Sequence, residues 1–217
     1  MANETMERLE RIGLIPVLRA RSASEAHALV EAMVAGGVEV VEVTMTVPGA
    51  IEILKDLKKT YGDRLLLGSG TVTTVAQCEA TIEAGAEFVV SPSLHLDVMA
   101  ATQKAGKVSI PGALTPTEVI TAWRAGAAYV KVFPCSALGG AKYLKALKAP
   151  FPEIRLIPTG GVTLTTAADF LHAGASALGV GTDLVNPTAI AKGEAHTITE
   201  TAQRYLQVIA QAKISAS

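Results

Sequence analysis

The sequence predicts an α/β fold of the TIM type, a (β/α)8 barrel in which eight strand-and-helix units enclose one core. Three observations support this fold: the apolar composition, a phrase that recurs at helix ends, and eight apolar segments at regular spacing. Apolar residues make up 49% of the 217 residues and charged residues 18%, as expected for a sheet covered by helices. We therefore expect a single barrel domain over residues 1–217, with an additional helix over residues 3–11.

The helix ends are marked by an Ala-Gly pair that recurs along the chain. Glycine just after a helical stretch is typical of a C-cap, because it adopts the left-handed backbone that ends many helices. Each pair leads into an apolar or β-branched run, so the repeating unit is a helix followed by a strand. The pairs lie at residues 35–36, 84–85, 105–106, 125–126 and 173–174.

Eight segments have the composition of strands. They follow one another at roughly 20 to 26 residues, which is the spacing of βα units and not of hairpins. A doubly wound open sheet shows the same alternation, but eight units at this spacing favour a closed barrel. The segments are GLIPVLRA (13–20), VEVVEVTM (38–45), RLLLGSGT (64–71), EFVVSPS (87–93), KVSIPGA (107–113), AYVKVFP (128–134), IRLIPTGG (154–161) and SALGVGT (176–182).

Two helix starts follow strand ends with a capping-box pattern. Ser22 precedes Glu25, and Thr115 precedes Glu118, each with the hydroxyl at the N-cap and the glutamate at the third position. In a barrel the carboxyl ends of the strands meet these helix starts, and the chemistry takes place on that face. We therefore expect the site among the polar groups at the strand ends.

Composition and charge exclude several classes of partner. The net charge is −1 with scattered Lys and Arg, so we expect neither a nucleic-acid nor a membrane partner. The first eleven residues lack the apolar core of a secretory signal, and no apolar run approaches the ~18 residues of a membrane span, which favours a cytosolic enzyme. Cys78 and Cys135 lie far apart, and the four histidines lack metal-ligand spacing, so no metal is expected.

Lys131 and Glu42 are the strongest candidates for catalysis. Lys131 shares a strand face with Tyr129 and Phe133, which turns it into the barrel. Burying an ammonium is costly, but a deprotonated lysine can attack a ketone and form an imine that serves as an electron sink. Glu42, on another apolar strand, can act beside it as general acid and base. A purely structural Lys–Glu ion pair is the alternative.

Two glycine-rich strand ends indicate an anion site. PTGGVT (158–163) and GVGTD (179–183) follow the seventh and eighth strands, where barrels commonly hold phosphate with backbone N–H groups. Neither has the G-x-G-x-x-G/A spacing of a dinucleotide site. Glycines needed only for turns would give the same pattern, so the phosphate site is one of two interpretations at this point.

Taken together, these segments resemble the 2-keto-3-deoxy-6-phosphogluconate (KDPG) aldolase family, which also contains 4-hydroxy-2-oxoglutarate (KHG) aldolase and the phosphogalactonate relative. The resemblance spans nearly the whole chain. It implies a class I, Schiff-base lyase built as a barrel, usually a homotrimer, that needs no cofactor. The motifs that carry it are PVLRA, GGVEVVEVTMTVPGA, GSGTV, FVVSPS, IPGALTPTE, VKVFP and PTGGV.

The resemblance also implies a role for each strand-end residue. Lys131 would form the imine and Glu42 would transfer protons. Arg19 and Thr71 would bind the substrate carboxylate, and Pro92 and Phe133 would pack around the pyruvyl group. Thr159 would contact a substrate hydroxyl. The phosphate would be bound by Gly160, Gly161, Gly181 and Thr182. The expected partners are a small 2-keto acid and an aldehyde.

The substrate within this family stays open. Some members carry an arginine four residues after the glutamate, where this chain has Thr46, which leaves Arg19 as the strand-end guanidinium able to bind a carboxylate or phosphate. We expect cleavage of KDPG to pyruvate and glyceraldehyde 3-phosphate, with KHG as a further substrate. The alternatives are the phosphogalactonate analogue, a phosphate-binding barrel isomerase or epimerase with no need for Lys131, and a barrel that binds without turnover.

Overall fold

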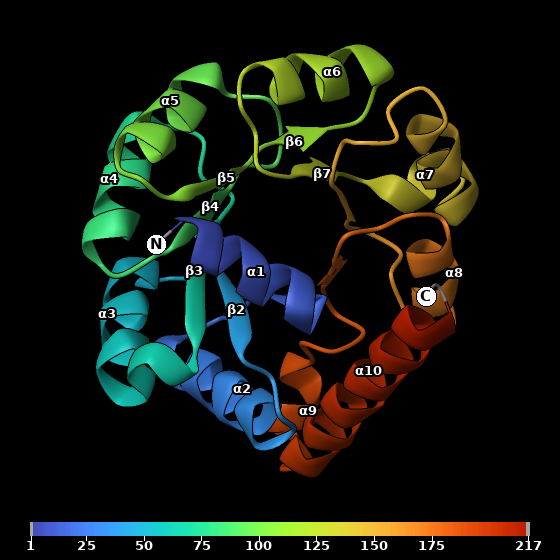
Figure 1. Ribbon diagram of the computed structural model, residues 1–217. Helices are drawn as coiled ribbons and strands as arrows, with labels where there is room; N and C mark the ends of the chain where they lie inside the picture. Colours follow the sequence, from blue (N-terminus) through green and yellow to red (C-terminus); the bar gives the residue numbers. More distant parts are fainter. Residues whose placement is uncertain (1, 216–217) are drawn as a thin grey trace.

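The computed structural model describes residues 2–215 and has the predicted barrel, with parallel strands at the centre and helices around them (Figure 1). The strands are β1 (Leu14–Leu18), β2 (Val40–Thr44), β3 (Leu66–Gly70), β4 (Phe88–Val90), β5 (Val108–Ile110), β6 (Gly112–Ala113), β7 (Val130–Val132), β8 (Leu156–Pro158) and β9 (Leu178–Val180). The α-helices are α1 (Ala2–Ile12), α2 (Ala23–Ala35), α3 (Ala50–Tyr61), α4 (Val75–Glu83), α5 (Leu96–Lys104), α6 (Pro116–Arg124), α7 (Ala141–Lys148), α8 (Ala167–His172), α9 (Pro187–Ala191) and α10 (Ala195–Ser215). Short 3-10 turns are η1 (Gly62–Arg64) and η2 (Cys135–Leu138).

The strands form a closed ring through two sheets and the links between them. One sheet has the order β5-β4-β3-β2-β1-β9 and the other β6-β7-β8. A parallel bridge between Thr159 and Gly179 joins β8 to β9, and Lys131 N donates to Pro111 O across the second junction, at 2.9 Å. Only Pro111, which has no N–H to donate, separates β5 from β6, so these two segments fill one of eight strand positions.

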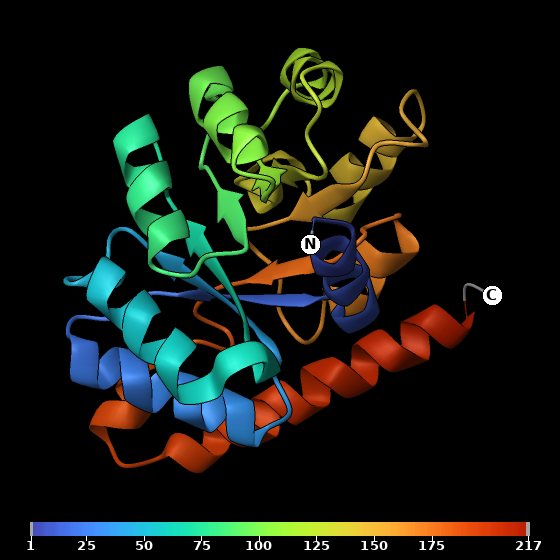
Figure 2. The same cartoon turned by 60° about the vertical axis from the view of Figure 1, so that its left-hand side comes forward.

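The N-terminal helix covers one end of the barrel. In Figure 1 α1 lies across the front of the ring, at the end where the strands begin. The Tyr129 hydroxyl, inside the barrel just before β7, donates to Met6 O on α1 at 3.1 Å. Figures 1 and 2 show α10 as the long helix along the outside of the ring. The carboxyl ends of the strands are therefore the end that α1 leaves uncovered.

The helices start and stop largely as their local sequences predict. Thr115 accepts from Glu118 N while the Glu118 carboxylate accepts from Thr115 N, which completes the capping box of α6. Ser22 caps α2, although Glu25 accepts from Arg21 N instead. Four Ala-Gly pairs end their helices with the glycine at positive φ. In the pair at residues 35–36, Gly36 has a negative φ, and the next residue, Gly37, has the positive φ instead. Gly36 serves close packing instead, since a Cβ there would lie 2.6 Å from Thr199 O of α10.

Alternation along the strands divides the core from the barrel interior. Val130 and Val132 are completely buried against the helices, while Lys131 between them turns inward and is 5% exposed. This alternation is the period-two pattern of a strand, here with apolar side chains on both faces because helices cover the outside. Within residues 2–215, no helix is long and apolar enough to cross a membrane.

Candidate active site

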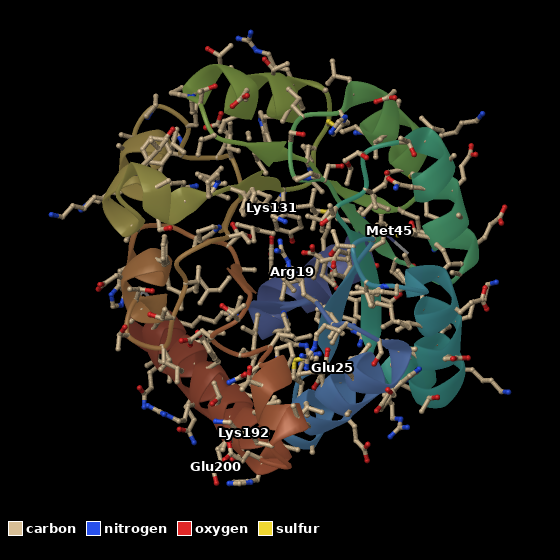
Figure 3. The ribbon with its side chains drawn as sticks, turned by 180° about the vertical axis from the view of Figure 1, so that it is seen from behind. Arg19, Glu25, Met45, Lys131, Lys192 and Glu200 are labelled. Atoms are coloured by element: carbon tan, nitrogen blue, oxygen red, sulfur yellow. The ribbon has the colours of Figure 1, made fainter. Side chains whose placement is uncertain are left out.

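Lys131 and Glu42 lie beside one another inside the barrel. Lys131 comes from β7 and Glu42 from β2, with Nζ 3.8 Å from Oε1 and side chains 6% and 3% exposed. Lys131 Nζ also lies 5.4 Å from the centre of the Phe133 ring. In Figure 3 Lys131 and Arg19 both point toward the middle of the ring, from opposite sides of it. The Lys131 amine and the Glu42 carboxylate, 3.8 Å apart, are too far from one another for a hydrogen bond.

One oxygen of the Glu42 carboxylate is buried without a hydrogen bond within residues 2–215. Oε1 has no hydrogen-bond partner among the described residues, which is costly for a buried charged oxygen. A cavity of about 10 Å³, room for roughly one water, lies beside it. It is lined by Ile15, Glu42, Val90, Ile110, Lys131, Ile157, Thr159 and Gly179. A reacting group that enters here would meet the amine and the carboxylate together.

Two glycines make room for the polar side chains of this interior. A Cβ on Gly70 would lie 1.9 Å from Glu42 Oε1, so the carboxylate occupies the space that the glycine leaves empty. In the same way, a Cβ on Gly179 would lie 2.1 Å from Thr159 Oγ1. The second glycine of GSG and the first glycine of GVG therefore allow close approach inside the barrel, a role that their local sequence does not indicate.

A larger pocket of about 480 Å³ opens at the carboxyl ends of the strands. The structure gathers seven of the predicted site residues there: Arg19, Phe133, Thr159, Gly160, Gly161, Gly181 and Thr182. It adds five that the prediction missed: Val17, Val162, Thr163, Asp183 and Val185. Thr159 lines both this pocket and the small cavity, so the pocket leads toward Lys131.

Arg19 is the single cation among the residues that line this pocket. Arg19 is exposed just after the end of β1, and it forms no ion pair within residues 2–215. An exposed guanidinium without a protein anion is available to a carboxylate or phosphate of a ligand. Asp183 is the single anion of the same lining, and its carboxylate is already engaged by Leu164 N and the Tyr205 hydroxyl.

Thr71 and Pro92 lie outside the lining of both cavities. Thr71 follows Gly70 directly and has φ of +58°, a strained backbone for a β-branched residue. Pro92 packs through its backbone on Gly112, where a Cβ would come within 2.4 Å of the Pro92 carbonyl. Both residues follow strand ends as expected, but their predicted contact with substrate stays a prediction.

Thr46, which stands where some members of the family carry an arginine, belongs to a short chain of hydroxyl contacts. The Thr46 and Thr44 hydroxyls are 2.8 Å apart, and Thr44 donates to Leu18 O, next to Arg19, at 2.8 Å.

Cys135 is buried after β7, and burial raises the pKa of its thiol to about 11. Such a thiol is protonated near neutral pH and is therefore a poor nucleophile.

Comparison with known proteins identifies the family. Residues 5–201 match the family model described as KDPG and KHG aldolase. The chain belongs to the KDPG and KHG aldolase family. It is therefore an aldolase, a class of lyase.

Two curated relatives of this aldolase differ in their named substrates. The 2-dehydro-3-deoxy-phosphogluconate aldolase of Treponema pallidum is 36% identical over 94% of this chain and 96% of the relative. The 2-dehydro-3-deoxy-6-phosphogalactonate aldolase of Escherichia coli is 37% identical over 80% of this chain and 85% of the relative. The named substrates of these relatives thus do not single out one substrate for this aldolase.

A solved relative of this family bears on the chemistry. The KDPG aldolase of Legionella pneumophila was captured with pyruvate as a covalent carbinolamine intermediate. It is 33% identical, with a TM-score of 0.85, over 92% of this chain and 96% of that chain. A carbinolamine is the adduct that precedes an imine, so Schiff-base chemistry is recorded in a close structural neighbour of this aldolase.

Proposed function

We propose that this aldolase reversibly cleaves KDPG to pyruvate and glyceraldehyde 3-phosphate through an imine on Lys131. The observation that carries the proposal is the pairing of Lys131 with Glu42 in the barrel interior, directly below a pocket lined by two glycine-bearing loops. An isomerase or epimerase could use the loops and Glu42, but it would have no use for a buried amine.

Each covalent step uses a group of the chain. The Lys131 amine adds to the C2 ketone, and loss of water gives a cationic imine. Glu42, directly or through a water in the small cavity, takes the C4 hydroxyl proton. The C3–C4 bond then breaks, its electron pair moves into the imine to give an enamine, and the phosphorylated aldehyde leaves. Protonation at C3 and hydrolysis return pyruvate and free Lys131.

The remaining predicted residues would bind the parts of the substrate that do not react. Arg19 supports recognition of an anion in the pocket, and Thr159, which faces both cavities, is suited to a substrate hydroxyl. Backbone groups of Gly160, Gly161 and Gly181, with the Thr182 hydroxyl, would hold the phosphate. We propose that Thr71, with Arg19, contacts the substrate carboxylate and that Pro92 and Phe133 pack around the pyruvyl portion, since the Phe133 ring lies 5.4 Å from Lys131 Nζ.

The phosphogalactonate analogue is the second candidate, favoured by the 37% identity to the Escherichia coli enzyme. KHG is the third, since the matching family model covers both named activities. The experiment that separates them measures pyruvate release from all three substrates with purified enzyme. The largest kcat/KM for KDPG supports the proposal, and a largest value for either other substrate replaces it.

The assembly and location are proposals drawn from the family resemblance. We propose a homotrimer in the cytosol. Light scattering on the purified protein tests the assembly, since a trimer has three times the 22.4 kDa mass of one chain. Monomer mass at micromolar concentration would contradict it.

A further inference from the structure

Asp183 stands out in a pocket proposed to hold phosphate. It is an exposed carboxylate among the lining residues, where it would repel a phosphate dianion. No residue at this position is needed for the imine chemistry. Its contacts show instead that it connects the two glycine-bearing loops to each other and to α10.

The first contact reaches the loop after β8. Leu164 N donates to Asp183 Oδ2 at 3.1 Å. The same loop closes on itself, because Thr163 N donates to the Thr166 hydroxyl at 2.9 Å, and that hydroxyl donates to Gly161 O at 3.1 Å. The position of Gly161 is therefore linked to Asp183 through these hydrogen bonds and the peptide bond between Thr163 and Leu164.

The second contact reaches the loop after β9, to which Asp183 belongs. Leu184 N and Val185 N donate to Gly181 O at 3.1 and 2.8 Å, which closes a tight turn around Asp183. A shift of the Asp183 backbone would therefore move Gly181 as well. The carboxylate therefore joins two neighbouring loops that both line the pocket.

The third contact anchors the carboxylate to the core. The Tyr205 hydroxyl of α10 donates a hydrogen bond to Asp183 Oδ2, and Tyr205 is completely buried. A buried phenol needs a partner for its hydroxyl, and Asp183 is the one that the structure records. Burial and the nearby Asp183 charge both raise the pKa of Tyr205, so the hydroxyl stays a donor.

We propose that Asp183 is a positioning residue that, held by Tyr205, sets the spacing of the Gly160–Gly161 and Gly181–Thr182 loops and thereby the affinity for the phosphate of the substrate. This inference rests on the proposed phosphorylated substrate and adds a residue that determines preference for it. Both donors reach the same carboxylate oxygen. An asparagine could therefore accept both hydrogen bonds with its one amide oxygen while removing the negative charge.

The test compares Asp183→Ala, Asp183→Asn and Tyr205→Phe with the wild-type enzyme. Inorganic phosphate serves as the probe, measured as a competitive inhibitor, and kcat and KM are measured for KDPG and for KHG. We expect Asp183→Ala to weaken phosphate about tenfold and to raise KM for KDPG much more than for KHG. Asp183→Asn is expected to stay within about twofold of wild type or to bind phosphate more tightly, since it keeps the acceptor and loses the repulsion.

Tyr205→Phe provides a variant with less risk to folding, because it removes only one oxygen. It leaves Leu164 N bonded to Asp183 and should give a smaller shift in the same direction as Asp183→Ala. Circular dichroism and thermal unfolding check that each variant is folded. Equal losses on KDPG and KHG, or an Asp183→Asn variant as weak as Asp183→Ala, would overturn the inference. Absence of phosphate inhibition in the wild-type enzyme would instead refute the proposed phosphate site itself.

Discussion

Glu42 Oε1 lies 3.8 Å from Lys131 Nζ and makes no hydrogen bond within the described residues, although both side chains are almost fully buried. A structural ion pair would be expected to make its hydrogen bonds, because desolvation costs both charges heavily. The unmet bonding capacity beside a water-sized cavity instead suits groups that act on a substrate. We therefore expect substitutions of Lys131 and Glu42 to affect catalysis.

Lys131 should be the one lysine that pyruvate labels. Incubation with pyruvate and borohydride should add one reduced pyruvyl group at Lys131, located by peptide mass spectrometry, and Lys131→Met should abolish both label and turnover. Lys107→Met is the matched control, since Lys107 pairs with Glu87 at 2.8 Å away from the pocket lining. A label on another lysine, or none, would contradict the mechanism.

Glu42→Gln should separate imine formation from proton transfer. The amide keeps the size of the side chain but cannot take a proton, so kcat should fall about 10²-fold or more. Labelling of Lys131 by pyruvate and borohydride should still occur. Glu87→Gln, on the outer ion pair, serves as the control and should retain activity. Unchanged turnover in Glu42→Gln would remove this residue from catalysis.

Gly70→Ala should disable the site by displacing the Glu42 carboxylate. The new methyl would lie 1.9 Å from Oε1 and 2.5 Å from Cδ, so the carboxylate must move by about an ångström, and misplacement on that scale costs about 10²-fold in rate. The loss should appear in kcat, with labelling of Lys131 largely retained. Wild-type kcat in a folded variant would show that the carboxylate position does not matter.

Gly181→Ala should discriminate between phosphorylated and unphosphorylated substrates. A Cβ at Gly181 meets no atom within 4 Å and the backbone there is not left-handed, so the methyl would project into the open pocket without disturbing the fold. We expect kcat/KM for KDPG to fall about tenfold more than for KHG. Equal losses on both substrates would argue against phosphate binding at this loop.

Gly161→Ala should distort its loop instead of only obstructing the phosphate, and so it contrasts with Gly181→Ala. Its Cβ would lie 2.3 Å from Ser136 Cβ, and its φ is +80°. The variant should therefore lose thermal stability and lower kcat/KM for both substrates alike. A pair of glycine variants with these different patterns would separate obstruction of phosphate from distortion of the loop.

Much of the molecule could be predicted from local sequence. The barrel followed from the spacing of eight apolar segments and the Ala-Gly helix ends, because secondary structure depends on periodicity and turn chemistry within a few residues. The inward direction of Lys131 followed from its alternation with Val130 and Val132. Seven strand-end residues expected around one pocket do line it, because the carboxyl ends of parallel strands meet on one face.

The tertiary structure alone decided which residues touch across the barrel. Gly70 beneath Glu42 and Gly179 beneath Thr159 depend on the register between neighbouring strands, which no local pattern encodes. The Asp183 link to Tyr205 joins residues 22 positions apart on a loop and an outer helix. Such contacts arise only when the ring closes and α10 packs against it. Local periodicity therefore determined the elements and the face of the site, and long-range packing determined the distances on which its chemistry depends.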